Sequence, residues 1–304
     1  MILPQESWSV AARRWRKAEE YGFDHAWTYD HLSWRSLADQ PWHATIPTLT
    51  AAATVTDRIG LGLFVASPNY RHPVPFAKEL ATLDDIAGGR VLVGVGSGGT
   101  GFDAYVLGQR ELTPRERHDR FVEFVDALDV LLRFEQPDAG GISFSGEWFV
   151  AHNARMVGTP SRRPRMPLLI AANGPKTIRY AARQGDGWVT TGGSEEEREQ
   201  WWSAIAALSR RFDDEYEASG RHDDIARILS IDIESDYSLA SAAAYEDAVG
   251  RAESLGFTDV VSHWPRGEGI YAGQESLLDE VAGMISSKSA AMPRSAIRDV
   301  GEVG

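Results

Sequence analysis

The chain has 304 residues, 43% of them hydrophobic and 25% charged, which suits one large α/β domain or two smaller ones. Its net charge of −13 argues against the basic surface that nucleic-acid binding needs. Because there is no cysteine, disulfides, thiolate nucleophiles and sulfur-ligated metals are excluded. The start, MILPQESWSV, is unlike a signal peptide, and no apolar run reaches the ~18 residues of a membrane span. We expect a cytoplasmic protein that binds neither nucleic acid nor membranes.

Four segments share one local pattern, in which a helical stripe ends at a glycine and a β-rich run follows at once. They are AEEYGFDHAWTYD, DDIAGGRVLVGVG, AARQGDGWVTTG and AESLGFTDVVSHW. Glycine suits this position because the residue that directly follows the last turn of a helix often adopts a positive φ, which glycine tolerates. The repeated pattern predicts βα units and a parallel sheet.

The chain as a whole predicts eight strands separated by helices. In chain order the strands are 2–3, 25–29, 59–65, 91–95, 168–171, 188–191, 228–233 and 259–263. One of the helices has a clear start, because Thr113 and Glu116 form a capping box around Pro114. This alternation predicts an α/β fold, a (β/α)8 TIM barrel that occupies residues 1–287 as a single domain. An open doubly wound sheet is the alternative.

Two segments interrupt the alternation. Residues 135–166, between the fourth helix and the fifth strand, contain GGISFSGEWFVAHNARMVGTPSRRPR, which predicts a hairpin followed by an extended basic segment. We expect this insertion to lie at the rim where the active site is. The tail 288–304 has no apolar period, so we expect it to be mobile.

Polar and glycine-rich segments follow the predicted strands at their carboxyl ends, where (β/α)8 barrels place their active sites. They include TYDHLSW, VASPNYRHP, GVGSGG, AANGPKT and SHWPRG. The glycine-rich GVGSGGTG is either a flexible turn or a close approach of backbone to a flat ligand. It fits a dinucleotide fingerprint poorly, because no helix follows directly.

The segment AANGPKT predicts an anion site. Asn173, Gly174 and Pro175 begin a helix directly after a buried strand, so backbone N–H groups are exposed at the positive end of the helix dipole. Lys176 adds a positive charge. We expect phosphate or carboxylate binding, and a plain N-cap is the alternative.

Asp30 and His31 follow the second predicted strand, and Trp34 lies just beyond them. We expect this pair to be catalytic, with Asp30 orienting the imidazole of His31; the alternative is that both residues brace the loop. No His-Glu-x-x-His pattern is present, so we expect no metal site. There is also no Gly-x-Ser-x-Gly elbow with a base partner.

The order of several segments resembles the luciferase-like flavin and deazaflavin oxidoreductase superfamily, whose members are (β/α)8 barrels. The segments are AEEYGFDHAWTYDHL, ASPNYRHPVPFAKELATLDDIAGGR, LVGVGSGG, RERHDRFVEFVDALDVLL and LIAANGPKTIRYAARQGDGWVTTG. The resemblance implies a cis peptide and a bulge between Phe64 and Val65, beneath the central ring of the cofactor. The forms TYDH and ASPNYRHPV resemble the branch that uses coenzyme F420, a deazaflavin that transfers hydride.

The resemblance also implies the residues of the site. His31 would lie nearest the hydride path, with Asp30 beside it. The cofactor would contact Phe64, Val65, Ser67, Gly96, Ser97, Gly98, Ala172, Asn173 and Gly174. We also expect Lys176 of the predicted anion site to bind the cofactor, and Trp34 and Trp264 to line the substrate pocket. Relatives that oxidise sugar phosphates carry a glutamate where this chain has Gly99, which argues against that substrate.

The function predicted from the resemblance is hydride transfer between coenzyme F420 and a small organic substrate, in a homodimer. One alternative is an FMN-dependent monooxygenase that uses O2 and flavin reduced by a partner flavin reductase. A second is a relative that binds flavin or deazaflavin without turnover. A hydrolase built on a generic phosphate-binding barrel is a third.

Overall fold

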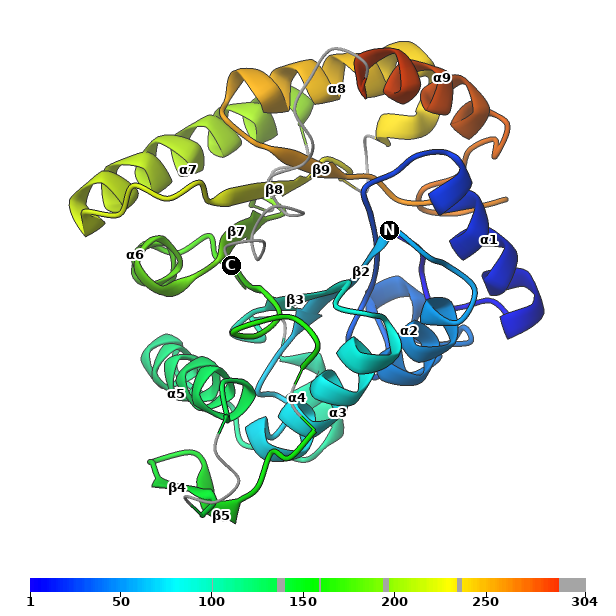
Figure 1. Ribbon diagram of the computed structural model, residues 1–304. Coiled ribbons are helices and arrows are strands. Elements are labelled where there is room, and N and C mark those ends of the chain that lie inside the picture. Colours follow the sequence, from blue (N-terminus) through cyan, green and yellow to red (C-terminus); the bar gives the residue numbers. More distant parts are fainter. Residues whose placement is uncertain (100, 136–139, 159, 194–196, 234–236, 290–304) are drawn as a thin grey trace. The chain divides into compact units, whose positions relative to one another are not determined.

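The computed structural model describes residues 1–99, 101–135, 140–158, 160–193, 197–233 and 237–289. The chain alternates strands and helices (Figure 1). It divides into two compact units. Unit 1 comprises Met1–Leu3, Lys17–Ala26 and Leu168–Gly304, and unit 2 comprises Pro4–Arg16 and Trp27–Pro167. The α/β class is therefore confirmed, while the single domain over 1–287 stays a prediction.

Unit 2 contains β2, β3 and helices α2 to α5, while β1 and α1 are divided between the two units, with residues 27–28 and 8–16 in unit 2. Strands β2 and β3 pair in parallel, and α2, α3 and α5 pack side by side on one side of them (Figure 1). The strands are β1 (His25–Thr28), β2 (Gly60–Ala66) and β3 (Val91–Val95). The helices are α1 (Trp8–Glu20), α2 (Thr45–Ala53), α3 (Pro73–Ile86), α4 (Phe102–Val106), α5 (Pro114–Leu132) and the short 3-10 helix Arg35–Leu37.

Unit 1 has the strand order β6-β7-β8-β9, in which every pair of neighbours is parallel. Helices α6 and α7 pack against each other, and α8 contacts α9. The strands are β6 (Leu168–Ala171), β7 (Gly187–Thr190), β8 (Ala226–Ser230) and β9 (Asp259–Val261). The helices are α6 (Pro175–Gln184), α7 (Arg198–Ser219), α8 (Ala242–Ser254), α9 (Leu277–Ser289) and the 3-10 helix Ser238–Ala240.

Seven of the eight predicted strands are confirmed, with small shifts at their ends. The prediction for residues 2–3 is wrong, because that segment is buried but is not a strand. The carbonyl of Met1 accepts a hydrogen bond from the Trp264 N–H at 2.8 Å. So short a segment packs into unit 1 without forming a ladder. The predicted mobile tail begins inside α9, and residues 290–304 lie outside the described part of the chain.

The capping box at the start of α5 is confirmed. The Thr113 side chain accepts from the backbone N–H of Glu116, and the Glu116 carboxylate accepts from the backbone N–H of Thr113. The helix therefore begins at Pro114, as the sequence predicts. From there α5 runs for 19 residues and buries Phe121 and Phe124 on one face.

Strand β2 is irregular near its carboxyl end. Its register with β3 shifts between Leu63 and Ala66, and the peptide bond between Phe64 and Val65 is cis. Both features agree with the resemblance. On the neighbouring strand, a Cβ at Gly94 would lie 2.5 Å from the carbonyl oxygen of Leu63. A glycine is therefore required at position 94, where the two backbones approach closely.

The predicted hairpin is present as the antiparallel pair β4 (Ile142–Ser145) and β5 (Val150–Ala154). Its turn is held by Glu123 of α5, whose carboxylate accepts from the backbone N–H groups of Glu147, Trp148 and Phe149. A Cβ at Gly146 would lie 1.9 Å from Oε1 of Glu123. One carboxylate thus fixes the hairpin turn to the helix.

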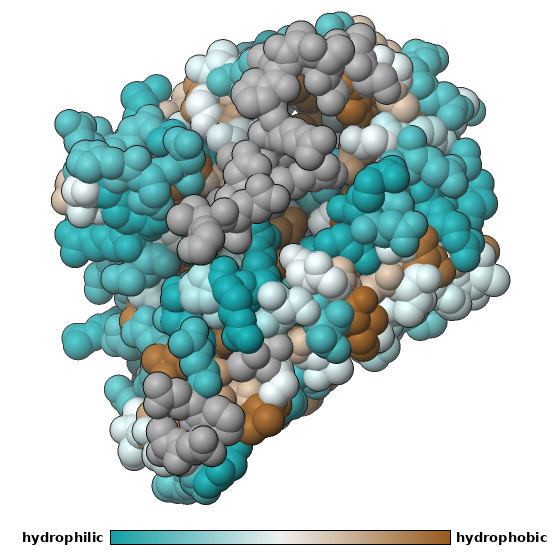
Figure 2. All heavy atoms as spheres, viewed as in Figure 1, coloured by the Kyte–Doolittle hydropathy of each residue, from teal (hydrophilic) through white to brown (hydrophobic). Residues whose placement is uncertain are grey.

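Polar residues dominate the face shown in Figure 2, where the hydrophobic patches are separate from one another. This distribution accords with the 25% of charged residues in the chain. Among the described helices, none combines the length and the hydropathy needed to cross a membrane.

The role of Glu123 is testable with Glu123→Gln. The amide nitrogen cannot accept hydrogen bonds, so at least one N–H of the hairpin turn loses its partner. We expect the free energy of unfolding, measured by urea denaturation, to fall by about 1–3 kcal/mol. Glu147→Gln removes an exposed carboxylate from the same turn and should leave the stability nearly unchanged. Equal stability of the two variants would contradict the role given to Glu123.

Candidate active site

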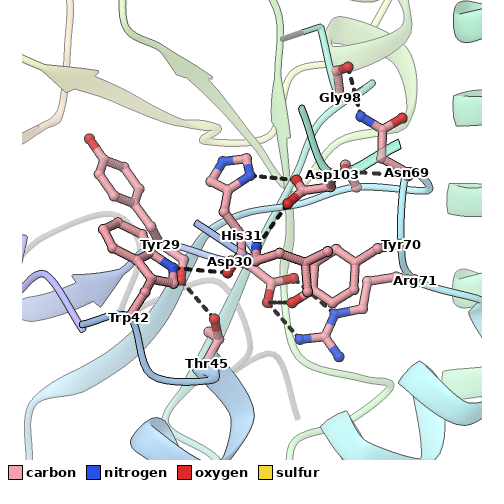
Figure 3. Close-up of polar contacts among 12 residues, drawn as sticks. Tyr29, Asp30, His31, Trp42, Thr45, Asn69, Tyr70, Arg71, Gly98 and Asp103 are labelled. Atoms are coloured by element: carbon pink, nitrogen blue, oxygen red, sulfur yellow. Dashed lines mark hydrogen bonds and ion pairs between the residues drawn. The ribbon is translucent and has the colours of Figure 1, made fainter. Parts of the chain in front are cut away.

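The side chain of His31 is oriented by Asp103, a residue of α4 in unit 2 (Figure 3). Nδ1 of His31 lies 2.7 Å from Oδ2 of Asp103, and the Leu32 N–H donates to Oδ1 at 2.8 Å. The His31 side chain is 10% exposed and that of Asp103 is 1% exposed. Because an ionised carboxylate only accepts, Nδ1 must carry a proton. Nε2 is then an acceptor in neutral His31, and it has no hydrogen-bond partner among the described residues.

Asp30 does not contact the His31 side chain, so the predicted partner was wrong. Its buried carboxylate accepts from Nε of Arg71 at 3.0 Å, from Nη2 of Arg71 at 2.6 Å and from the Tyr70 hydroxyl at 2.7 Å (Figure 3). Both oxygens of Asp30 are thus engaged by residues of the loop after β2, which leaves Asp103 to hold the imidazole. Burial raises the pKa of Tyr70, and the charge of Asp30 raises it further. The hydroxyl therefore stays protonated as a donor.

Sequence reasoning missed Asp103. It lies 72 positions from His31, and no motif links the two. The available signal was a single acid in the apolar segment FDAYVLG, directly after the glycine-rich loop. A buried carboxylate needs hydrogen-bond donors, and this one finds a backbone N–H and an imidazole.

Aromatic rings gather around His31. The Trp34 ring is centred 4.5 Å from the imidazole, and the Tyr29 ring lies 5.1 Å from Trp34. Nε1 of Trp42 donates to the carbonyl of His31 at 2.9 Å. The guanidinium of Arg35 lies over the Trp34 ring at 4.6 Å. The structure thus brings the predicted substrate residue Trp34 beside the predicted catalytic residue His31.

The loops after β2 and β3 are joined by hydrogen bonds within unit 2. The Gly96 N–H donates to the carbonyl of Ala66 at 2.8 Å, and Nδ2 of Asn69 donates to the carbonyl of Gly98 at 2.9 Å. Ser67 is buried, and its hydroxyl lies 3.4 Å from the Asn69 N–H. These contacts bring together three of the predicted cofactor residues.

Three further residues, Phe64, Val65 and Ser97, complete the predicted ring-binding set in unit 2. The buried Phe64 packs edge-on against Trp27, with the ring centres 5.7 Å apart. Val65, which follows the cis bond, and Ser97 are half-buried. Gly99, in the same loop, is exposed.

The remaining predicted cofactor residues belong to unit 1, at the carboxyl end of β6. Ala172 is buried, and Asn173 Oδ1 accepts from the Thr190 hydroxyl at 2.7 Å while its amide nitrogen donates to the Gly192 carbonyl. Gly174 is the N-cap of α6 and offers no side-chain cap. Lys176 is exposed in the first turn. Because the N-cap residue is a glycine, no side chain at this position caps the backbone N–H groups of the first turn. Anion binding here stays a prediction.

Trp264 is nearly enclosed within unit 1. It is 6% exposed, and its ring is centred 6.2 Å from that of Tyr21. Nε1 donates to Oε2 of Glu275 at 3.4 Å. These contacts give Trp264 a packing role, and its place in a substrate pocket stays a prediction.

Unit 1 contains a second acid–imidazole pair that sequence reasoning did not identify. Nδ1 of His263 lies 2.9 Å from Oδ2 of Asp232, and the Tyr271 ring stacks on the imidazole with centres 3.7 Å apart. Both members of the pair are buried, and burial lowers the pKa of His263 below its ordinary value. The Ser238 N–H donates to Oδ1 of Asp232, so the pair ties the segments after β8 and β9 together.

The chemistry available at His31 is proton transfer and hydrogen bonding. Across the described ranges, no three His, Asp or Glu side chains are grouped so that they could hold a metal ion. An imidazole held at Nδ1 by a carboxylate can take a proton at Nε2 and return it.

The chain is similar to two bacterial dehydrogenases over part of their length. It is 36% identical over 184 residues to the F420-dependent glucose-6-phosphate dehydrogenase of Beutenbergia cavernae, a match that covers 58% of this chain and 50% of that protein. It is 35% identical over 185 residues to the F420-dependent hydroxymycolic acid dehydrogenase of Mycobacterium tuberculosis, covering 57% of this chain and 46% of that protein. The chain thus spans about half the length of these relatives.

Solved structures show the same fold. The coenzyme F420-dependent tetrahydromethanopterin reductase of Methanopyrus kandleri matches with a TM-score of 0.71 at 19% identity, covering 92% of this chain and 95% of that one. An F420-dependent secondary alcohol dehydrogenase in complex with an F420-acetone adduct matches with a TM-score of 0.72 at 19% identity, covering 86% and 92%. At this identity the likeness concerns the fold alone.

A family model also matches the chain. The model described as luciferase-like monooxygenase matches residues 1–245, which is most of the 304-residue chain. This range includes both loops that carry His31 and Gly98. The chain therefore belongs to the luciferase-like monooxygenase family.

Proposed function

We propose that the protein is an oxidoreductase that transfers hydride between coenzyme F420 and a small organic alcohol or carbonyl compound. The observation that carries this proposal is the pair of His31 and Asp103, which leaves Nε2 of the imidazole as an acceptor. Removal of hydride from an alcohol carbon requires a group that takes the hydroxyl proton. The two dehydrogenase relatives, both named as F420-dependent, support the choice of cofactor.

The residues of unit 2 fit a flat ring system. At the carboxyl end of β3, positions 94, 96 and 98 are all glycine, so no side chain projects from the backbone at these positions. Backbone N–H and carbonyl groups can therefore approach a planar heterocycle closely. The residues proposed to hold the ring are Phe64, Val65, Ser67, Gly96, Ser97 and Gly98.

The residues of unit 1 fit an anionic group. The first turn of α6 has backbone N–H groups without a side-chain cap, and Lys176 adds a positive charge. We assign the binding of a phosphate or carboxylate of the cofactor to Ala172, Asn173, Gly174 and Lys176. Because the Asn173 side chain is engaged by Thr190 and Gly192, it contributes through its backbone.

Bound F420 would supply the carbon that accepts or donates hydride. In alcohol oxidation, Nε2 of His31 takes the hydroxyl proton while hydride leaves the carbon, and a carbonyl compound forms. Asp103 stabilises the resulting imidazolium through the bond at Nδ1, and it fixes the ring orientation. Trp34 restricts the space beside the imidazole and so orients the substrate. In carbonyl reduction, His31 returns the proton to the oxygen.

Glucose 6-phosphate is not the substrate we propose. The relative from Beutenbergia cavernae is named for it. The resemblance places Gly99 where sugar-phosphate oxidisers have a glutamate, so a carboxylate would be missing here.

The alternative is an FMN-dependent monooxygenase, since the family name and the long-chain alkane monooxygenase among the solved neighbours both point to that chemistry. It would depend on a partner flavin reductase. A relative that binds the cofactor without turnover is a further alternative. The proposal also includes a homodimer in the cytoplasm. It includes a closed (β/α)8 barrel over residues 1–287, with an insertion at 135–166. Solved neighbours that match most of the chain support the barrel.

Cofactor choice is tested by fluorescence titration of the purified protein with F420 and with FMN. We expect tighter binding of F420, because the proposed chemistry needs a hydride carrier and no O2. Tight binding of FMN with none of F420 would assign the protein to the monooxygenase alternative. Absence of binding by either cofactor would favour the hydrolase predicted as a minor alternative from the sequence.

Catalysis is tested with His31→Ala and Asp103→Asn. Turnover should fall about 10²-fold in His31→Ala, the lower range for a positioned acid–base group, while F420 affinity changes much less. In Asp103→Asn the single remaining acceptor oxygen cannot serve both Leu32 and His31, so turnover should also fall. His152→Ala, which changes an exposed histidine on β5, is the control.

The assay for this test first needs a substrate. Cyclic enones, alcohols and quinones should be screened with both reduced and oxidised F420. Normal turnover by folded His31→Ala, or a loss of F420 binding as large as the loss of turnover, would contradict the catalytic role of His31.

The anion site is tested with Lys176→Ala. The dissociation constant of F420 should rise at low salt, and the difference from wild type should shrink at high salt because ions screen the charge. Arg183→Ala removes an exposed charge from the last turn of the same helix and serves as the control. An unchanged dissociation constant at low salt would mean that Lys176 is an ordinary surface residue.

A further inference from the structure

Arg120, on α5, is a buried cation without a carboxylate partner in the part of the chain that the structure describes. It is 7% exposed; Nη1 donates to Oε1 of Gln109 at 3.1 Å, and Nη2 donates to Oδ1 of Asn69. Burial lowers the pKa of this guanidinium, and the nearby charges of Arg110 and Arg117 lower it further. Keeping such a charge buried is costly, so the residue must provide something that an apolar side chain could not.

Asn69 transmits the contact to the loop after β3. Its Nδ2 donates to the carbonyl of Gly98 at 2.9 Å (Figure 3), while its own backbone carbonyl accepts from Gln109. Gly98 has φ +72, and a Cβ there would lie 2.2 Å from Nδ2 of Asn69. The amide and the glycine backbone therefore interlock, and this loop cannot shift unless Asn69 shifts as well.

The same carbonyl connects the loop to the acid that holds His31. Gly101, the N-cap of α4, donates its N–H to the carbonyl of Gly98 at 3.2 Å. Asp103 lies in the first turn of that helix and accepts from His31. Hydrogen bonds thus lead from Arg120 through Asn69 to Gly98, and from there to the start of α4.

We propose that Arg120 is a positioning residue, which acts through Asn69 to hold the Gly96–Gly98 loop and Asp103 in place for a planar heterocyclic cofactor. This inference rests on the proposed function. A charged donor strengthens and orients the next hydrogen bond in a series. Polarisation of the Gly98 carbonyl makes the N–H of the same peptide, which belongs to Gly99, a stronger donor to a carbonyl or anionic oxygen of the ring.

The test compares Arg120→Lys, Arg120→Met and Arg115→Gln in the full chain. Methionine keeps much of the side-chain volume without a donor, whereas lysine keeps the charge and one donor toward Asn69. The dissociation constant of F420 should rise ~10-fold or more in Arg120→Met and only ~3-fold in Arg120→Lys. Arg115→Gln removes an 82% exposed charge from the same helix and should bind as wild type does. Urea denaturation verifies that each variant is folded at the titration temperature.

If Arg120 only fills space, the dissociation constant of F420 in Arg120→Met will be closer to that of wild type than the value in Arg120→Lys. That result would overturn the inference. Equal affinity of Arg120→Met and wild type would overturn it too. If Arg120→Met does not fold, Asn69→Asp replaces it: the carboxylate keeps the bond to Arg120 but cannot donate to Gly98, so affinity should fall ~10-fold. An Asn69→Asp variant with wild-type affinity for F420 would contradict the role of Asn69 between Arg120 and Gly98.

Failure of this inference is distinguishable from failure of the proposed function. If the wild-type protein binds no F420, the proposed function is wrong and the inference fails with it. If wild type binds F420 and the Arg120 and Asn69 variants bind equally well, only the inference fails.

Discussion

The interlock of the Asn69 side chain with the Gly98 backbone is the constraint on which the candidate site depends. A Cβ at position 98 would collide with the amide, and only a side chain with both an acceptor and a donor can serve Arg120 and Gly98 together. This explains why the loop after β2 is so polar. It must satisfy groups on α5 and on the loop after β3, besides joining β2 to α3.

The two acids near His31 have different tasks because of where their oxygens point. Asp30 is saturated by Arg71 and Tyr70, which fixes the loop after β2 against the end of β1. Asp103 divides its oxygens between the backbone N–H of Leu32 and the imidazole of His31. Asp30 thus fixes the loop after β2, whereas Asp103 fixes both the backbone at Leu32 and the ring of His31. The orientation of the imidazole therefore follows α4 rather than the adjacent residue in the chain.

What the sequence predicted correctly was local or periodic. The strands after Gly22 and Gly256, the capping box at Thr113 and the hairpin were all accessible, because each depends on residues near in the chain. The cis bond before Val65 came from the resemblance, since no propensity encodes it. Residues 2–3 have strand-like composition but are too few to form a ladder.

The missing part of the site depends on contacts between distant residues. Asp103 meets His31 across 72 positions, and Arg120 meets Asn69 across 51. Hydrophobic periodicity predicts the buried face of α5, yet it cannot predict which polar group will bind Arg120 in that face.

The surroundings of a buried charge indicate whether it needs a ligand. The buried Asp30 is paired with Arg71, and this ion pair stabilises a loop without needing a ligand. A buried cation with only neutral hydrogen-bond acceptors, such as Arg120, keeps an uncompensated charge. The proposed hydride transfer depends on the placement of two carbons, so a charge on α5 that orients the backbone of the site suits that demand.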